Sequence, residues 1–277
     1  MTNEIVLMWA AVTAYALGAV LFVVGAVFGR EKLEKLALWF SLGGVVPHVA
    51  AIAIRWVRVG HGPAIGFYEV VSSYALFAVL AFALLVWRVP GLRRLGTVVM
   101  PIVFLLIGGA MLAPTSDLEI TATLASWWLT IHVLFAKLAS GSFITAFALA
   151  LAYLVREKRS DGTMARWFSR LPDQEIVDDL SFRFVAVGFI FLSIMIVAGA
   201  IWANEAWNRY WAWDPIETWS LIWWLTYAVY LHLRLTLGWL GTKSAWLAVA
   251  ALPIALFAAV GVAIVFNSIH GAYLTGY

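Results

Sequence analysis

The chain has 277 residues, of which 64% are hydrophobic and only 12% are charged, and it contains no cysteine. A soluble domain carries about 25% charged residues, so this composition excludes a soluble globular fold and indicates a protein that lies in a bilayer. The net charge of +3 comes from a few basic clusters, which gives no reason to expect nucleic-acid binding. The lack of cysteine excludes disulfides and thiolate metal sites formed by this chain.

Eight runs of mostly apolar residues are each long enough to cross a bilayer, which takes about 20 residues of helix. We therefore predict an all-α polytopic membrane protein that forms a single membrane domain over residues 1–277. The first run follows no basic residue and is longer than the apolar core of a signal peptide, so we expect it to be retained. The predicted spans are Ile5 to Phe28, Leu36 to Ile54, Val70 to Trp87, Leu95 to Ala113, Trp127 to Val155, Phe184 to Ala203, Pro215 to Leu240 and Ser244 to Ile269.

Lys and Arg are distributed unevenly between the two sets of connecting loops. Fourteen of the 18 lie on one side, where residues 156–183 form the longest basic loop. The other side holds only Arg55, Arg58 and Arg209, and Lys137 falls within a span. Because basic loops stay in the cytoplasm, residues 156–183 are expected to be cytoplasmic and both termini extracytoplasmic. The extracytoplasmic loops are then residues 55–69, 114–126 and 204–214.

The segment from Trp202 to Trp224 reads WANEAWNRYWAWDPIETWSLIWW and holds seven of the 16 Trp residues of the chain. Trp is common in the interfacial belts of membrane proteins, so a belt is one explanation. Three of the seven, Trp207, Trp211 and Trp213, lie in a short loop outside either span, where so much aromatic surface requires a flat apolar partner. The pattern favours a planar macrocycle that lies against the extracytoplasmic face.

Asp214, Pro215 and Glu217 stand at the start of the seventh predicted helix. Asp at the N-cap, Pro at the first helical position and Glu at the third form a capping box, which satisfies backbone amides that lipid cannot. This structural role is favoured over proton transfer, so we assign no catalytic residue to this chain.

Two of the five histidines are expected on the same membrane face as the Trp-rich loop. His132 lies near the start of the fifth span, and His270 follows the end of the eighth. Two neutral imidazoles at one level beside an aromatic platform match the ligands of a six-coordinate haem iron. His232 is different, because it lies about 25 Å along its helix from Pro215, at 1.5 Å per residue. An ionisable side chain at that depth is a candidate functional residue.

Three further polar residues stay ambiguous at this point. His48 follows Pro47 in mid-span and is either a partner of His232 or a packed core residue. Lys137, five residues after His132, either pairs with an acidic group or reaches a wet cavity. A cytochrome b needs paired histidines on two helices, and His61, in a loop, fits that pattern poorly.

These motifs resemble those of the haem-handling proteins of cytochrome c maturation, closest to the CcsA (ResC) branch, with CcmC and CcmF as more distant relatives. The segment from Trp202 to Leu221 follows the family's WWD motif, with Ala203 in place of the usual Gly. The segment from Arg55 to Glu69 resembles the family's RW…GH-P…YE stretch, with Phe67 where many members have Asn. The ending that begins at His270 resembles the family's His-x-x-Tyr ending. The resemblance therefore runs from the second span to the C-terminus.

The resemblance implies that the chain moves haem b outward and presents it to apocytochrome c, whose Cys-x-x-Cys-His motif receives it covalently. It implies that His132 and His270 are the axial ligands of an extracytoplasmic site and that His232 is the transmembrane histidine on the route of haem. A CcsB (ResB) partner supplies the second transmembrane ligand, so haem lyase (cytochrome c synthetase) activity is expected only of the complex. The WWD residues expected to bind the cofactor are Trp202, Trp207, Trp211, Trp213, Asp214 and Glu217.

Two other functions stay open. One is a non-catalytic regulator of tetrapyrrole biosynthesis, as HemX-like proteins are, which predicts that cytochromes c form in its absence. The other is a transporter of an aromatic or anionic solute, which predicts that no haem is bound. In each case the chain is integral to a lipid bilayer, either a bacterial cytoplasmic membrane or a thylakoid-type membrane, with its active site extracytoplasmic.

Overall fold

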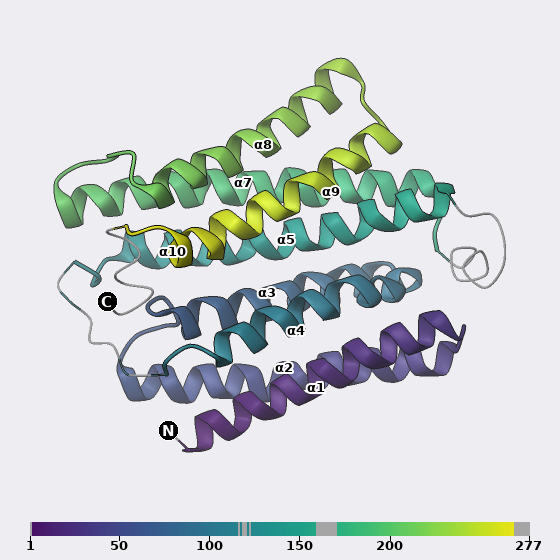
Figure 1. Ribbon diagram of the computed structural model, residues 1–277, viewed down its shortest axis with the longest axis horizontal. Helices are drawn as coiled ribbons and strands as arrows, with labels where there is room; N and C mark the ends of the chain where they lie inside the picture. The colour runs from purple at the N-terminus through teal and green to yellow at the C-terminus, as the bar shows by residue number, and fades with distance from the viewer. Residues whose placement is uncertain (1, 116, 118–120, 122, 159–170, 269–277) are drawn as a thin grey trace.

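A computed structural model describes residues 2–115, 117, 121, 123–158 and 171–268. Long antiparallel helices run side by side through the molecule, in an order that broadly follows the chain from α1 to α8, and α9 turns back to lie between α8 and α5 (Figure 1). The helical segments are α1 (Thr2–Val27), α2 (Glu31–Val59), α3 (Phe67–Arg88), η1 (Pro90–Leu95), α4 (Gly96–Met111), α5 (Trp127–Lys158), α7 (Gln174–Trp207), α8 (Pro215–Leu237), α9 (Thr242–Leu256), the π-helical turn η2 (Phe257–Gly261) and α10 (Val262–Val265).

The prediction of an all-α polytopic membrane protein is confirmed. In the described part of the chain, seven helical segments are both long enough and apolar enough to cross a membrane. The one predicted span outside these seven is the seventh, α8, which has 23 residues but is rich in Trp and Tyr and carries His232 and Arg234, so its mean hydropathy is lower. The fourth and eighth spans are composite, because η1 continues into α4 and α9 continues through η2 into α10.

Three predicted boundaries are wrong because charged residues were read as loop. Helix α2 continues to Val59 and α3 begins at Phe67, so the predicted loop at residues 55–69 shortens to residues 60–66. Helix α7 begins at Gln174, ten residues before the predicted Phe184. Polar residues extend these helices because protein partners satisfy them: Arg234 on α8 donates to Asp178 on α7 at 2.8 Å. Within the predicted cytoplasmic loop, residues 159–170 lie outside the described residues.

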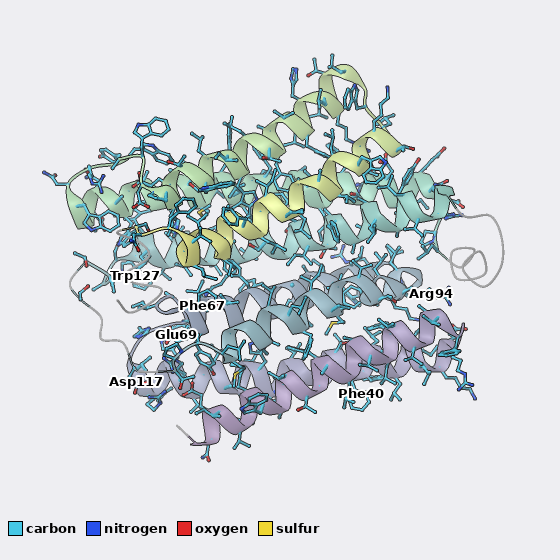
Figure 2. All side chains as sticks on the ribbon, viewed as in Figure 1. Phe40, Phe67, Glu69, Arg94, Asp117 and Trp127 are labelled. Atoms are coloured by element: carbon cyan, nitrogen blue, oxygen red, sulfur yellow. The ribbon has the colours of Figure 1, made fainter. Side chains whose placement is uncertain are left out.

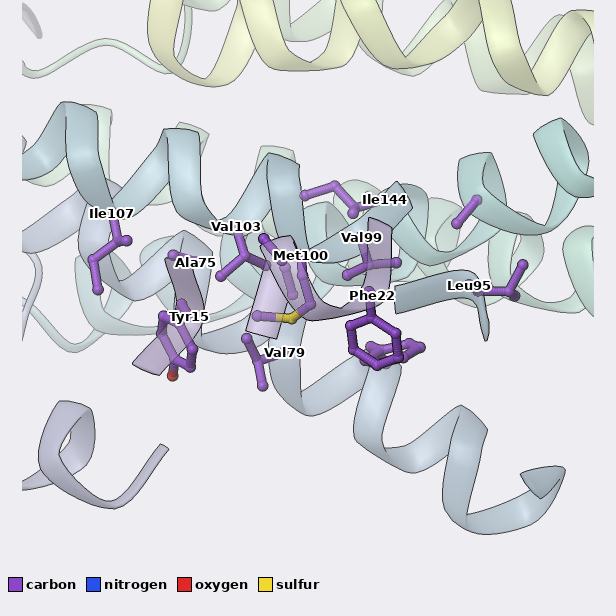
Figure 3. Packing of buried hydrophobic residues seen from close by; sticks show 14 of the residues in the cluster. Tyr15, Phe22, Ala75, Val79, Leu95, Val99, Met100, Val103, Ile107 and Ile144 are labelled. Atoms are coloured by element: carbon purple, nitrogen blue, oxygen red, sulfur yellow. The ribbon is translucent and has the colours of Figure 1, made fainter. Parts of the chain in front are cut away.

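Helix α5 joins the two halves of the apolar core. One cluster of buried residues lies among α1 to α4, where Tyr15, Phe22 and Met100 pack together (Figure 3). A second cluster lies among α5, α7, α8 and α9. Gly141 on α5 lies against α3, and a Cβ added to it would stand 2.6 Å from the Phe77 carbonyl oxygen. Close approach of small residues is the usual basis of helix packing in lipid, where apolar burial gives little driving force.

Ion pairs close the end of the bundle where η1 lies. Arg94 on η1 donates through Nε to both carboxylate oxygens of Glu34 on α2, at 2.8 and 3.0 Å. Both side chains are buried, and Arg93 pairs with Glu31 nearby. Breaking a buried pair by removing one partner costs about 3–5 kcal/mol, because the remaining charge is left uncompensated. This pair therefore fixes η1 against the α1–α2 hairpin.

The loop residues 60–66, 112–115, 123–126 and 208–214 gather at one end of the bundle, together with the described ends of the chain (Figure 1). The connections between α1 and α2, α3 and η1, and α8 and α9 lie at the opposite end. The first end is the one that the distribution of Lys and Arg predicts to be extracytoplasmic. We call it the outer end below.

The orientation is testable with single introduced cysteines, because the chain has none of its own. Ala125 at the outer end and Lys32 at the other end both have exposed side chains. A membrane-impermeant maleimide added to intact cells should label the Ala125→Cys variant at once and the Lys32→Cys variant only after permeabilisation. The reverse order of labelling would contradict the orientation.

Candidate functional site

A cavity of about 1130 Å³, including its open mouth, lies at the outer end between α3, α5, α7, α8 and α10. Small residues such as Ala136, Ala200 and Ala259 line part of its wall, and Trp202, Trp211 and Trp223 supply a large aromatic surface. The sequence-predicted residues His132 and Glu217 also line it, so the structure brings the fifth helix and the WWD segment together.

His132 on α5 is fixed by a hydrogen bond to the backbone of α7. Its Nδ1 lies 2.8 Å from the carbonyl oxygen of Met195. A carbonyl oxygen only accepts, so Nδ1 carries the hydrogen, and in the neutral ring the lone pair resides on Nε2. Metal-binding histidines commonly have this arrangement, in which one ring nitrogen donates to a carbonyl and the other ligates. The ring is therefore in the tautomer that a metal ligand requires.

Gly199 on α7 makes room for the His132 ring. A Cβ added to Gly199 would stand 2.5 Å from Nδ1 of His132, closer than real side chains approach. Gly199 follows Met195 by one helical turn, so the missing side chain opens the path from the imidazole to the Met195 carbonyl. The sequence analysis did not identify this residue, because nothing in the sequence shows which α7 residue faces His132.

Trp202 forms the buried floor of the WWD segment. Only 3% of its surface is exposed, and its Nε1 donates to the Thr123 carbonyl at 2.8 Å, which ties α7 to the loop before α5. Its ring lies 6.4 Å from the His132 ring, with 29° between the planes, and 4.9 Å from Trp207. Trp202 therefore connects the histidine to the rest of the aromatic segment.

Trp211 and Trp213 face different surroundings. Trp211 lines the cavity, and its Nε1 is buried without a hydrogen-bond partner among the described residues. Trp213 is 68% exposed and adopts φ +62°, which is uncommon for a residue with a side chain. The two rings meet edge to face at 5.8 Å. Of these two Trp residues of the loop, Trp211 is therefore part of the cavity wall and Trp213 is part of the exposed surface.

The predicted capping box at the start of α8 is confirmed. The Asp214 carboxylate accepts from the Ile216 amide at 3.0 Å, and the Glu217 carboxylate accepts from the Asp214 amide at 3.2 Å. Glu217 also accepts from the Ala212 amide at 2.7 Å, so one side chain folds the loop back onto the helix. Both carboxylates are used to shape the loop, as the sequence analysis favoured.

The remaining histidines lie in three different settings. His232 is exposed on α8, where its Nδ1 is 3.4 Å from the Thr236 hydroxyl. His48 is fully buried between α1 and α2, and its Nδ1 is 3.2 Å from the Tyr15 hydroxyl. Helices α2 and α8 lie on opposite sides of the molecule, so His48 is a packed core residue and the suggested pairing with His232 is wrong (Figure 1). His270, the other predicted axial ligand, lies outside the described residues.

A group of charged side chains, most of them buried, lies beside the cavity at the outer end, where Figure 2 shows Glu69 and Asp117. We call it the outer ionic cluster, and it consists of Glu4, Arg55, Arg58, Glu69, Asp117 and Lys137. Arg55 donates to Glu69 at 2.6 Å and to Glu4 at 3.2 Å, and Arg58 donates to Glu4 at 2.7 Å. The hydrogen bond from Arg58 also lowers the pKa of Asp117 below its ordinary value. Arg55 and Arg58 are therefore committed within the protein.

Lys137 and Glu69 hold the loop at residues 60–66. The Lys137 ammonium is buried and donates to the carbonyl oxygen of Pro63, while a Glu69 oxygen accepts from the Ile65 amide at 3.3 Å. Nδ1 of His61 lies 2.8 Å from the Gly62 carbonyl oxygen and 3.7 Å from Glu69. Lys137 thus has both a carboxylate nearby and a backbone acceptor. The sequence analysis named Arg55, Arg58, Glu69 and Lys137 without joining them, because the outer ionic cluster draws its side chains from five separate segments.

Comparison with known proteins identifies the family of the chain. Residues 64–270 match the model of the family described as cytochrome C assembly protein. The chain is 33% identical over 233 residues to the cytochrome c biogenesis protein CcsA of Chlamydomonas reinhardtii, covering 80% of this chain and 64% of that protein. It is 32% identical over 293 residues to CcsA of Parasynechococcus marenigrum (strain WH8102), covering 90% of this chain and 95% of that protein.

Among solved structures, the fold is similar to that of the cytochrome c haem lyase CcmF, with a TM-score of 0.72 at 18% sequence identity. The alignment covers 99% of this chain but 48% of that one, so this chain spans about half of CcmF. At this identity the likeness shows the fold alone. The match of the family model over most of the chain and the CcsA relatives above 30% identity show that the chain belongs to the cytochrome c assembly protein family.

Proposed function

We propose that this chain acts in cytochrome c assembly by holding haem b in the outer cavity, between His132 and His270, and presenting it to apocytochrome c. The observation that carries the proposal is the His132 ring, fixed as an Nδ1 donor at the wall of a large aromatic cavity. The family supports the role in cytochrome c assembly. The ligands, the cofactor and the partner are our inference.

The donor set fits an iron porphyrin. The porphyrin supplies four of the six iron ligands, so one or two imidazoles complete the coordination without a cluster of acidic or thiolate residues. Among the described residues, no group of three or more His, Cys, Asp or Glu side chains is placed to hold a bare metal ion. The lone pair on Nε2 of His132 supplies one axial ligand, and His270 is our candidate for the second.

The cavity wall fits the macrocycle. Its indole and alanine surface matches a flat apolar ring, for which stacking and burial are the main sources of affinity. The buried Nε1 groups of Trp211 and Trp223 have no acceptor among the described residues, although buried indoles normally find one. A ligand with carboxylates at its edge supplies such acceptors.

Arg209 is the candidate partner for a haem propionate. Of the three bases predicted at the outer face, Arg55 and Arg58 are committed to the outer ionic cluster. Arg209 lies on the WWD loop with its guanidinium 5.8 Å from the Trp207 ring, next in sequence to the cavity residues Tyr210 and Trp211. No carboxylate within 4 Å is recorded for it among the described residues. A guanidinium suits bidentate recognition of a carboxylate.

The reaction itself needs little from this chain beyond positioning. Each thiol of the apocytochrome adds its S–H across one haem vinyl group to form a thioether, so every atom is retained and no thiol is needed from this chain. The fixed His132 ring and the folded WWD loop would orient the macrocycle. His132 and His270 would hold the iron through their imidazoles, and the two ligands would protect it from oxygen.

His232 is the candidate contact with a CcsB (ResB) partner. Its side chain is exposed on a membrane-spanning helix, where an ionisable group is costly unless another protein or a ligand covers it. Arg234, two residues further along, is held by Asp178 and Ser244. These contacts fix the rotation of α8, so His232 stays on the exposed side of the helix. We infer that haem passes this histidine when the partner supplies the second ligand, and that lyase activity belongs to the complex.

Replacement of His132 by Gln should weaken haem binding at least tenfold, as removal of an axial ligand does, and should change the visible spectrum of the reduced complex. The matched control is His48→Gln, which removes a fully buried imidazole that does not line the cavity. The measurement is haem content and spectrum of the chain purified with its partner. Equal haem content and identical spectra in His132→Gln and unchanged protein would contradict the role of His132.

The Gly199→Ala variant tests whether the hydrogen bond from His132 to the Met195 carbonyl matters for haem binding, while His132 itself is kept. The added methyl group displaces the His132 ring from the Met195 carbonyl, so haem affinity should fall several-fold although both histidines remain. Gly188→Ala is the control, because its Cβ crowds the Phe143 ring, away from the cavity, at 2.7 Å. Equal haem affinity in the two variants, measured by titration, would show that the Met195 contact does not matter for binding.

The role of Arg209 can be separated from general packing by changing the ligand. The unchanged protein should bind haem about tenfold more tightly than haem dimethyl ester, in which both propionates are uncharged esters. This is the effect expected for loss of a hydrogen bond to a charged group. In Arg209→Gln the preference should disappear, because the charge that recognises the carboxylate is gone. If the preference persists in Arg209→Gln, another group binds the propionates.

A further inference from the structure

We propose that the outer ionic cluster positions one wall of the haem cavity, and that Glu69 and Lys137 are positioning residues of the site. Neither side chain lines the cavity. Both hold the loop at residues 60–66, which does: Ala64 is part of the cavity wall. The link to haem rests on the proposed function, whereas the positioning of the loop can be tested without ligand.

Side chains from two helices tether the backbone of this loop on either side of Ala64. Before it, the Pro63 carbonyl accepts from Lys137 on α5, and after it, the Ile65 amide donates to Glu69 on α3 at 3.3 Å. Ile65 is 4% exposed and packs with Leu124, Leu129 and Trp202, of which all three line the cavity. A shift of the loop therefore moves the cavity wall and the packing of Trp202.

Glu69 couples this loop to the α1–α2 hairpin. One of its oxygens accepts from the Ile65 amide, and the other accepts from Arg55 at 2.6 Å. Arg55 in turn binds Glu4 on α1 and the Thr115 carbonyl, each at 3.2 Å. The hairpin lies outside the region that the family model matches, residues 64–270, yet it supplies three of the six charged groups. We infer that the hairpin serves the site through this chain of contacts.

The composition of the cluster favours a geometric role over a purely stabilising one. It combines three bases and three acids, and Glu4, Glu69 and Lys137 are at least 96% buried. Buried ion pairs add little net stability compared with apolar packing of the same volume, but their directional bonds restrict geometry. The buried Arg94–Glu34 pair at the opposite end offers a direct comparison, because it makes similar contacts far from the cavity (Figure 2).

The first experiment measures exposure of the loop in the ligand-free chain. The chain has no cysteine, so an Ile65→Cys substitution gives a single reporter in native membranes. We expect maleimide to label the Ile65→Cys variant slowly when it carries no other substitution. Labelling should be at least tenfold faster when Glu69→Gln or Lys137→Met is added. Lys137→Arg retains a donor for Pro63 and should restore slow labelling. Glu34→Gln, at the other end, should leave the labelling rate within twofold of the reporter alone.

Unchanged labelling in both Glu69→Gln and Lys137→Met would overturn the proposal. So would equal acceleration by Glu34→Gln, because that result would show general loosening of the bundle. If one outer variant fails to accumulate in the membrane, the other still decides, since each removes a separate tether. These outcomes do not depend on whether the chain binds haem.

The second experiment connects the wall to the ligand in the chain purified with its partner. Haem titration should show at least tenfold weaker binding and an altered visible spectrum in Lys137→Met, with recovery of both in Lys137→Arg and no spectral change in Glu34→Gln. Faster labelling with unchanged haem binding and spectrum would refute the link between wall and site. If neither the unchanged chain nor any variant binds haem, the proposed function is refuted. The labelling experiment then still tests whether Glu69 and Lys137 position the loop.

Discussion

The hydrogen bond from His132 to the Met195 carbonyl determines what the outer cavity can bind. It commits Nδ1 of the ring as a donor and leaves Nε2 with the lone pair, which is the state that a metal ligand needs. It also joins α5 to α7, the two helices that carry the histidine and the first half of the WWD segment. Gly199 makes the bond sterically accessible, and Trp202 lies beside the ring. Changes in any of these three contacts alter the same imidazole.

The sequence predicted the number and type of helices because lipid imposes a simple rule. Each span must be about 20 residues long and must satisfy its own backbone, so apolar runs are reliable indicators. The rule failed where charged residues continue a helix. Arg55 and Arg58 were read as loop, yet they end α2 within a network of carboxylates. Their partners are distant in sequence, so polarity alone could not distinguish a loop from a helix whose charges are paired.

The candidate site was predictable to the extent that local patterns determine it. The capping box is a contact among neighbours, and Asp214 and Glu217 were assigned correctly from their spacing. The meeting of His132 with Trp202 was expected from equal depth in the membrane and is present. Gly199 and the tethers of the loop at residues 60–66 were missed, because they depend on which faces of α5, α7 and α3 pack together. The place of His270 relative to His132 stays a prediction.

The most direct measurement of the central claim is an experimental structure of the haem-loaded chain with its partner. We expect the iron to be bonded to Nε2 of His132, with Nδ1 still donating to the Met195 carbonyl, and the second axial position to be held by His270. An iron ligated elsewhere, with the His132 ring unchanged and uncoordinated at the cavity wall, would contradict the assignment of this cavity as the haem site.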